Sequence, residues 1–229
     1  MEPMRPRTGT VRRTTSETDI ELTLCLDGAG AAEVGTGIGF LDHMLTLFAH
    51  HGRFDLNVRA AGDLDVDGHH TVEDIGLALG QALREALGDK RGIVRYGSFL
   101  LLMDEALALV AVDLSGRPFL AHNLELAGVR IGEFEADLTA HFFRSLVNQA
   151  GITLHIRMLA GEDPHHIVEA AFKGTARALA EACGRHGRDD AVPSSKGTLL
   201  SMETRVIRGR PAQPGRPACL SAGAGRQWT

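Results

Sequence analysis

The feature that most constrains the fold of this chain is an internal duplication. The segment from Phe40 to Gly88 is similar to the segment from Asp137 to Gly184, with one loop two residues shorter in the second copy. A repeat of this kind predicts that the same elements are built twice. We therefore expect two similar halves that pair face to face.

The hydrophobic pattern predicts the same order of elements in each copy. Apolar residues alternate with polar ones from Phe54 to Val58 and again from Ile152 to Ile156, as in half-buried strands. A stretch rich in helix-forming residues follows in each copy and ends at Gly88 or Gly184. Each half is thus predicted to run helix, strand, loop, helix, and strands in one sheet with helices on one face give an α+β fold. Two further strands are predicted, at Ile20 to Leu26 and at Ala106 to Asp113.

Four segments are predicted along the chain. They are a disordered N-terminus at residues 1–9, a first α+β repeat at 10–94, a second at 95–200 and a disordered C-terminal tail at 201–229. The tail is crowded with glycine, proline, alanine and arginine and has no apolar period, which is typical of disorder. The segment Gly35-Thr36-Gly37-Ile38-Gly39 lacks the spacing of a dinucleotide-binding loop and is expected to form a turn before a helix.

Composition and charge narrow the class of protein. A net charge of -5 gives no basic field for nucleic acid, so no nucleic-acid partner is expected. The longest apolar run, Phe99 to Val112, contains Asp104 and Glu105 and is shorter than the roughly 20 residues of a membrane span. No membrane partner or secretory signal is expected, and the cytoplasm is the expected location. The cysteines are few and their number is odd, which favours reduced thiols over disulfides. They are Cys25, Cys183 and Cys219.

Two copies of one histidine-rich motif lie at matching places in the two repeats. They are His69-His70-Thr71-Val72-Glu73 and His165-His166-Ile167-Val168-Glu169. In a helix, residues three or four apart share a face, whereas neighbours diverge by about 100 degrees. His70 and Glu73 can therefore share one metal ion, and His69 is free to reach a second. The same argument applies to the second copy, and imidazole with carboxylate favours a first-row transition metal.

Two more histidines complete the set of candidate metal ligands. His43 and His141 lie at matching places, each in the helix that precedes a strand. With the two motifs they supply eight groups, which allows three histidines and one glutamate for each of two ions. An octahedral ion held in this way keeps two positions for substrate or water, as a catalytic metal requires. The alternative for a histidine is a surface or core role, but packing does not explain the same set in both copies.

Several short segments occur together and in order along the chain. They are Arg13 to Thr18, Gly39 to Leu45, Asp67 to Asp74, Arg95 to Gly97, Met103 to Ala106, Asp113 to Pro118 and Pro193 to Gly197. In this combination the chain resembles the imidazoleglycerol-phosphate dehydratase family, from about Arg12 to Leu200. It departs from the family pattern at Leu102, where relatives often have proline, and in the tail.

The resemblance implies an activity, a fold and an assembly. The activity is a hydro-lyase step of histidine biosynthesis that converts a phosphorylated imidazole, D-erythro-imidazole glycerol phosphate, to imidazole acetol phosphate with two Mn²⁺ per active site. The fold is a tandem duplication of two α+β halves, each similar to domain 2 of ribosomal protein S5. The assembly is a homo-oligomer, commonly of 24 subunits, with active sites at subunit interfaces.

The family's site residues carry over to matching positions of this chain. The resemblance assigns the first ion to His43, His70, Glu73 and His165, and the second to His69, His141, His166 and Glu169. It assigns substrate contacts to Glu17, Arg95, Arg117, Lys173, Ser195 and Lys196. Arginine and lysine suit a phosphate group, and the alternative for each is a solvated surface charge. Glu17 and the eight ligands form the predicted catalytic set.

The implied reaction requires a base. No carbonyl lies beside the carbon–oxygen bond that breaks, so the imidazole ring has to supply the electrons, and metal binding favours the deprotonated ring. A carboxylate must then remove a carbon-bound proton. Glu17 is the predicted base because it lies in a matched segment outside the metal set. The alternative is a surface glutamate that pairs with Arg12 or Arg13.

Two other functions stay open at the level of sequence. A binuclear metal phosphomonoesterase also uses paired ions and a bound phosphate, although such sites usually carry more aspartates and bridging carboxylates. In a non-catalytic metal-assembled shell, the ions would only join subunits. The chain contains no H-E-x-x-H, P-loop or G-x-S-x-G motif, which argues against zincin proteases, P-loop NTPases and α/β-hydrolases.

Overall fold

The computed structural model describes residues 6–186 and 191–199, and the predicted tail at 201–229 lies outside them. The first half contains β1 (Thr8–Thr14), β2 (Thr18–Cys25), β3 (Ala32–Gly35), α1 (Gly39–Gly52), β4 (Asp55–Gly62) and α2 (His69–Leu87). The second half contains β5 (Tyr96–Met103), β6 (Ala106–Asp113), β7 (Phe119–His122), β8 (Arg130–Ile131), β9 (Phe134–Glu135), α3 (Leu138–Ala150), β10 (Thr153–Ala160) and α4 (Pro164–Cys183).

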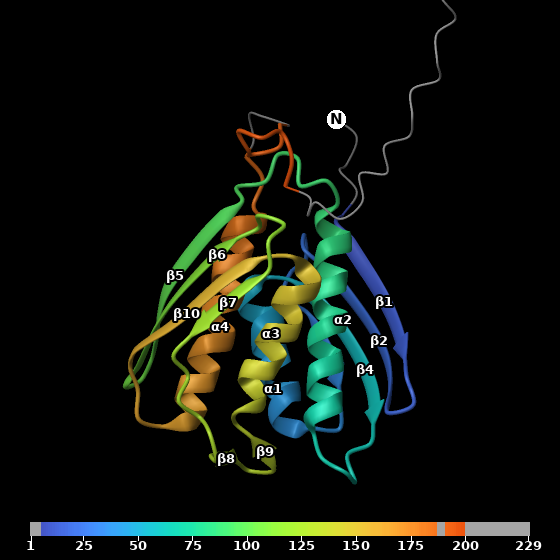
Figure 1. The fold of residues 1–229 in the computed structure, drawn as a ribbon, viewed down its shortest axis with the longest axis vertical. Helices are drawn as coiled ribbons and strands as arrows, with labels where there is room; N and C mark the ends of the chain where they lie inside the picture. Colours follow the sequence, from blue (N-terminus) through green and yellow to red (C-terminus); the bar gives the residue numbers. More distant parts are fainter. Residues whose placement is uncertain (1–5, 187–190, 200–229) are drawn as a thin grey trace, which may run out of the picture.

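Two four-stranded sheets form the outer layers, and the long helices fill the space between them (Figure 1). The strand orders are β1-β2-β4-β3 and β5-β6-β10-β7. In each sheet an antiparallel hairpin comes first, the next strand pairs antiparallel with it, and a short strand, β3 or β7, pairs parallel at the edge. The identical order confirms the predicted duplication of two α+β halves.

The hydrophobic core lies between the sheets and is continuous across both halves. On β2, Ile20, Leu22 and Leu24 are buried, while the residues between them are exposed or half-buried. This alternation turns one side of the sheet toward the helices. Aromatic rings join α3 to α4 in the same core. Phe142 and Phe143 contact Phe172, with ring centroids 5.0 and 4.9 Å apart.

Most predicted elements are confirmed. β6 has the predicted bounds, and β2 begins two residues before the predicted strand. α2 and α4 end directly before Gly88 and Gly184, and α1 begins at Gly39, the last residue of the predicted turn. The apolar run Phe99 to Val112 forms the hairpin of β5 and β6, with Asp104-Glu105 as its turn. Within the described residues, no helix is long and apolar enough to cross a membrane.

The predicted N-terminal boundary has to be moved. Residues 1–9 are predicted to be disordered, but β1 begins at Thr8, which pairs with Cys25 of β2. Arg7 is held as well, because its guanidinium donates to Asp27 at 2.6 Å and to the carbonyl of Cys183 at 2.6 Å. Residues 1–5 lie outside the described part of the chain, and the predicted boundaries at residues 94 and 200 stay predictions.

The two halves meet through pairs of helices. α1 packs against α4, and α2 packs against α3. Glycines on α2 allow the second pair to come close, since a Cβ at Gly80 would overlap the carbonyl oxygen of Leu146. A Cβ at Gly76 would lie 2.7 Å from the carbonyl oxygen of Phe142. Close-packed interiors do not absorb such overlaps, so these two positions set the distance between the halves.

Replacing Gly80 with alanine is expected to destabilise the fold. Alanine is favoured in a helix by roughly 1 kcal/mol, but overpacking costs about 1–3 kcal/mol. We expect a net loss of about 1 kcal/mol of unfolding free energy, measured by urea unfolding at fixed protein and metal concentrations. Gly39→Ala is the matched control because a Cβ there meets no atom within 4 Å. Wild-type stability of Gly80→Ala would contradict the close packing of α2 on α3.

Candidate metal centre

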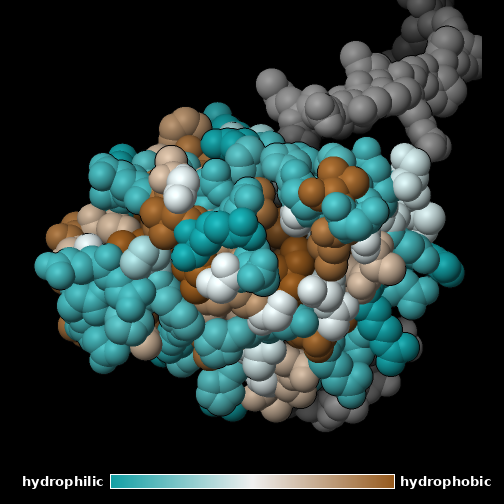
Figure 2. All heavy atoms as spheres, turned by 90° about the horizontal axis from the view of Figure 1, so that it is seen from below, coloured by the Kyte–Doolittle hydropathy of each residue, from teal (hydrophilic) through white to brown (hydrophobic). Residues whose placement is uncertain are grey.

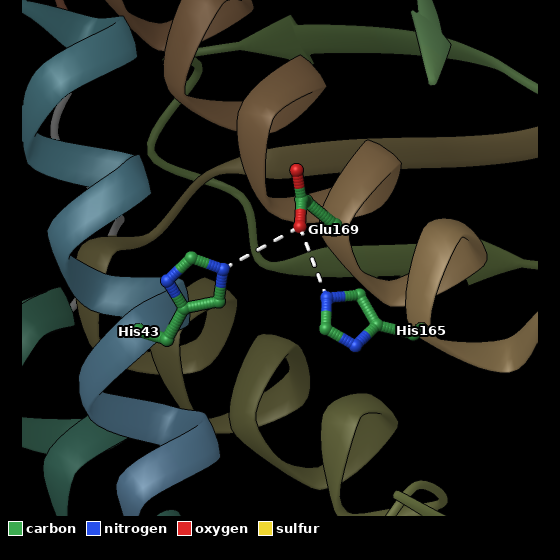
Figure 3. A group of neighbouring side chains, drawn as sticks. All are labelled: His43, His165 and Glu169. Atoms are coloured by element: carbon green, nitrogen blue, oxygen red, sulfur yellow. Dashed lines mark hydrogen bonds and ion pairs between the residues drawn. The ribbon is translucent and has the colours of Figure 1, made fainter. Parts of the chain in front are cut away.

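Three of the predicted metal ligands come together between α1 and α4 (Figure 3). His43 projects from α1, while His165 and Glu169 project from α4. Glu169 Oε2 lies 3.5 Å from His43 Nε2 and 3.2 Å from His165 Nε2. One donor atom of each residue lies within 4.8 Å of the others. Two imidazoles and a carboxylate at this spacing can hold a transition metal ion.

The start of α4 positions two of these side chains. The Asp163 side chain caps the helix by accepting the backbone N–H of His165 at 2.8 Å. Pro164 occupies the first turn, where a backbone N–H would have no helical partner. His165 and Glu169 are four residues apart and share one helical face. Because α1 packs against α4, it brings His43 from the other half to this face.

Glu169 is the most buried member of the group. Its side chain is 7% exposed and pairs with the ammonium of Lys173. Burial alone would raise the pKa of Glu169, but the hydrogen bond and charge of Lys173, with smaller effects of His165 and His43, lower it below the usual value. Glu169 is therefore an ionised oxygen donor at neutral pH.

A second group is related to the first by the duplication. His141 of α3 lies beside His69 of α2, with ring centroids 4.8 Å apart, and Glu73 Oε2 lies 3.8 Å from His69 Nε2. The Glu73 side chain is 45% exposed, in contrast to the buried glutamate of the first group. Leu77 stands where the first group has Lys173. The two groups thus share their ligand types but differ in burial and charge.

The second histidine of each motif faces other carboxylates. His70 Nδ1 lies 2.9 Å from Asp63 Oδ2, and this hydrogen bond raises the pKa of His70. His166 Nδ1 lies 2.7 Å from Glu105 Oε2, a bond that likewise raises the pKa of His166. The sequence reasoning missed both carboxylates. The available signal for Glu105 was a pair of charges in the middle of an apolar run.

Glu17 lies in the turn between β1 and β2 and also faces the first motif. Its Oε2 is 3.8 Å from His70 Nδ1, and its side chain is 48% exposed. The neighbouring Arg12 and Arg13 pair with other carboxylates, at 3.5 and 2.8 Å. The alternative pairing of Glu17 with either arginine does not occur among the described residues. Glu17 is therefore near one of the predicted metal ligands and open to a substrate.

The structure brings some of the assigned ligands together and separates others. The histidine pairs assigned to one ion are neighbours: His43 with His165, and His69 with His141. Glu169 is assigned to the second ion with His166, yet its carboxylate lies beside the first pair. Glu169 follows His165 by four residues and therefore lies on the same helical face as that histidine. The ring of His166 instead contacts Glu105. The division of the eight ligands between two ions stays a prediction.

Two of the predicted phosphate contacts, Arg95 and Arg117, pair with one carboxylate. Arg95 Nε donates to Asp113 at 2.8 Å, and another Arg95 nitrogen donates to the carbonyl of Pro193 at 2.8 Å. Arg117 lies 3.7 Å from the same Asp113. The exposed pair Ser195-Lys196 follows Pro193 by two residues. Asp113 thus orients the two arginines next to the segment that contains the predicted serine and lysine.

This cationic group is distant from the metal ligands of the same chain. The backbone N–H of Arg95 donates to Ala182 at the end of α4, whereas His165 lies in the first turn of that helix. The helix between Ala182 and His165 is roughly 25 Å long, at a rise of 1.5 Å per residue. Lys173 lies partway along it and pairs with Glu169. A small molecule in contact with one end cannot reach the other.

A cavity of about 850 Å³ opens beside His43, at the end of the molecule that is lowest in Figure 1. The loops before α1 and α2 and the β8–β9 hairpin form its walls, with Ile38, Leu64, Val66 and Phe134 among the apolar residues. Figure 2, seen from this end, shows apolar surface within a recess that hydrophilic residues surround. A concave, mostly apolar site beside a few polar groups is typical of small-molecule binding.

Comparisons with known proteins extend these observations. A family model for imidazoleglycerol-phosphate dehydratase matches residues 36–179. The imidazoleglycerol-phosphate dehydratase of Trichlorobacter lovleyi is 54% identical over 193 residues, which are 84% of this chain and 99% of that protein. The enzyme of the same name from Acetivibrio thermocellus is 53% identical over 189 residues, covering 82% of this chain and 97% of that protein.

Solved structures give the same result. The crystal structure of imidazoleglycerol-phosphate dehydratase from Staphylococcus aureus has a TM-score of 0.71 and 41% identity, and covers 78% of this chain and 99% of that one. The structure of the Pyrococcus furiosus protein has a TM-score of 0.72 and 41% identity, with coverage of 82% and 100%. Sequence and fold thus point to the same set of relatives.

Replacing Lys173 with methionine is expected to destabilise the protein strongly. The change leaves the Glu169 carboxylate buried without its cation, which typically costs about 3–5 kcal/mol when one partner of a buried pair is removed. Urea unfolding of the metal-free protein measures the loss. Arg144→Met, which removes an exposed charge on α3, is the control. The double variant Lys173→Met/Glu169→Leu should recover most of the stability, and equal stability of Lys173→Met and the control would contradict the pairing.

Proposed function

The chain belongs to the imidazoleglycerol-phosphate dehydratase family, the hydro-lyases of histidine biosynthesis, and we propose that it converts D-erythro-imidazole glycerol phosphate to imidazole acetol phosphate with two Mn²⁺ ions. The observation that carries the proposal is the repeated meeting of two histidines and a glutamate across the two halves. All eight candidate ligands lie within the segment that the family model matches. The comparisons give no support to a phosphomonoesterase or a non-catalytic shell.

The donor set of this chain fits the proposed ions. Imidazole nitrogens and carboxylate oxygens without thiolates suit a first-row transition metal such as manganese, and Glu169 is ionised for this role. We assign one ion to His43, His70, Glu73 and His165, and the other to His69, His141, His166 and Glu169. When bound, such ions would act as Lewis acids and stabilise negative charge on the imidazole ring of the substrate.

The geometry supports an active site that several copies share. An extended imidazole glycerol phosphate is no longer than about 10 Å, whereas roughly 25 Å of α4 separates Ala182, next to Arg95, from His165 in one chain. The candidate metal ligands and the cationic group at Arg95 can contact the same substrate molecule only if a second copy of the chain supplies one of the two. We therefore propose a homo-oligomer, of 24 subunits as in the resemblance, whose sites lie at the interfaces. A cytoplasmic location completes the proposal for this biosynthetic enzyme.

Each remaining residue has a role that its position allows. Glu17 is the proposed base, which takes the carbon-bound proton next to the imidazole ring at its exposed carboxylate. The phosphate is bound by forked and point cations that Asp113 helps to orient. We assign this binding to Arg95, Arg117, Lys173, Ser195 and Lys196, although Lys173 pairs with Glu169 in the free protein.

Product analysis tests the proposed reaction. The protein with Mn²⁺ and imidazole glycerol phosphate should give a ketone product that keeps its phosphate, and a chelator should abolish the reaction until Mn²⁺ is restored. Phosphate release and product structure are measured by a phosphate assay and by mass spectrometry. Free phosphate would instead indicate a phosphomonoesterase, and no reaction would favour the shell.

Glu17→Gln isolates the base in the same assay. General base catalysis contributes about 10²–10⁴-fold, so kcat should fall by that factor while the protein still binds two Mn²⁺ per chain. Glu21→Gln removes the same charge from the same hairpin, on a side chain that is 58% exposed and pairs with Arg12, and should keep wild-type kcat. Wild-type turnover by Glu17→Gln would remove Glu17 from the mechanism.

Mixed oligomers test whether copies share a site. Glu17→Gln and Arg117→Glu subunits, each inactive alone, are co-expressed with different tags and purified together. If two chains supply these residues to one site, about a quarter of the sites contain both intact residues in an even mixture. We expect activity near that fraction of wild type. A mixed oligomer without activity would show that one chain supplies both residues.

A further inference from the structure

We propose that Glu105 is a positioning residue of the metal centre, which holds the His166 ring through Nδ1 and leaves Nε2 as the atom for the ion. The inference rests on the proposed function, because His166 is a metal ligand there. Glu105 itself contacts neither an ion nor the substrate in this proposal. It acts through the histidine, in the way that carboxylates often orient metal-bound imidazoles.

Both oxygens of Glu105 are engaged. Oε2 lies 2.7 Å from His166 Nδ1, while Oε1 accepts the backbone N–H groups of Glu162 at 3.2 Å and Asp163 at 2.9 Å. These two residues directly precede α4, the helix that carries His166. Glu105 therefore ties the hairpin turn of β5 and β6 to the start of α4. The His166 ring is held relative to its own helix by a carboxylate from another element.

The chemistry of the pair selects one form of the ring. An ionised carboxylate only accepts hydrogen bonds, so Nδ1 of His166 has to carry the hydrogen. Nε2 of the neutral ring then has a free lone pair, which is the form that binds a metal. Two backbone N–H groups donate to Oε1 of Glu105, which favours its ionised form. Nε2 points away from Glu105 toward the exposed carboxylate of Asp104, 3.6 Å away.

The first half contains the same contact, built from a different place in the repeat. His70, the counterpart of His166, has its Nδ1 2.9 Å from Asp63 Oδ2. Asp63 follows β4, whereas Glu105 lies in the β5–β6 turn. The equivalent turn of the first half, between β1 and β2, carries Glu17, whose Oε2 lies farther away, 3.8 Å from the same Nδ1. In both halves the close partner of this ring atom is thus a carboxylate, as a requirement for a hydrogen-bond acceptor at Nδ1 predicts.

Glu105→Gln tests the role with little change in shape. The amide oxygen can keep the two backbone N–H groups, which places the NH₂ group against Nδ1 of His166. Nδ1 must then accept, so the hydrogen of the neutral ring moves to Nε2 and blocks the metal-binding atom. Loss of such a partner typically weakens metal affinity by about 10–100-fold. Glu162→Gln is the matched control, since it removes one charge from the adjoining loop and leaves the backbone bond intact.

Two readouts are measured on the full chain. Calorimetric titration with Mn²⁺ should find two tight sites per chain in the wild type and in Glu162→Gln, and one site weakened by about 10–100-fold in Glu105→Gln. Long-range ¹H–¹⁵N spectra of the metal-free protein should show the hydrogen of neutral His166 on Nδ1 in the wild type and on Nε2 in Glu105→Gln. A role in folding alone would not exchange the two ring forms.

The outcomes separate this inference from the proposed function. Two equally tight sites in Glu105→Gln, or a wild-type His166 with its hydrogen on Nε2, would overturn the positioning role and leave the dehydratase untouched. A wild type that binds no Mn²⁺ would overturn the proposed metal sites and this inference with them. If Glu105→Gln fails to fold, the ring form of His166 in the wild type still decides the matter.

Discussion

The packing of one half on the other, α1 on α4 and α2 on α3, is the contact on which the site depends. Each helix that precedes a strand carries one of the candidate ligand histidines, and each motif helix carries the other candidate ligands, so neither half holds a complete group. The two helix contacts bring these residues together across the halves, as His43 with His165 and His141 with His69. Close approach at Gly76 and Gly80 keeps the second contact tight. A change that spreads the helices would therefore affect the ligands and the core together.

Symmetry of the fold does not extend to the charges. Glu169 is buried against Lys173, while its counterpart Glu73 is open and has Leu77 nearby in sequence. Burial of a carboxylate without a cation is costly, so the lysine is what allows Glu169 to lie deeper than Glu73. An asymmetric substrate, with a ring at one end and a phosphate at the other, needs such a difference between two otherwise equivalent groups. The duplicated halves supply the candidate ligands. Single residue differences between the halves make the two ligand groups unequal.

The sequence predicted what depends on local pattern. Periodicity and the repeat spacing gave both sheets their central strands, the helix ends at Gly88 and Gly184, and the ligand-bearing helices. β3 and β7 escaped prediction because four residues are too few to show a period. The contact of Glu105 with His166 escaped it because the two residues are 61 positions apart and meet only when the hairpin folds over α4. In the proposed homo-oligomer, the division of the candidate ligands between two ions would depend on neighbouring copies, and the sequence pattern of one chain does not show how copies are arranged.

The length of α4 also constrains how copies can assemble. The candidate metal ligands of α4 lie in its first turns, and the cationic group at Arg95 lies at its other end, so the two surfaces that meet in the proposed assembly are different parts of the chain. Two unlike surfaces can meet in a two-fold dimer, in which each copy gives one surface and receives the other, or in a head-to-tail contact, which produces a closed ring or an open filament. Every site is complete only if the assembly closes. Sites shared in the proposed way therefore require a symmetry that closes, and a cubic shell of 24 copies is one arrangement in which every copy both gives and receives the missing group.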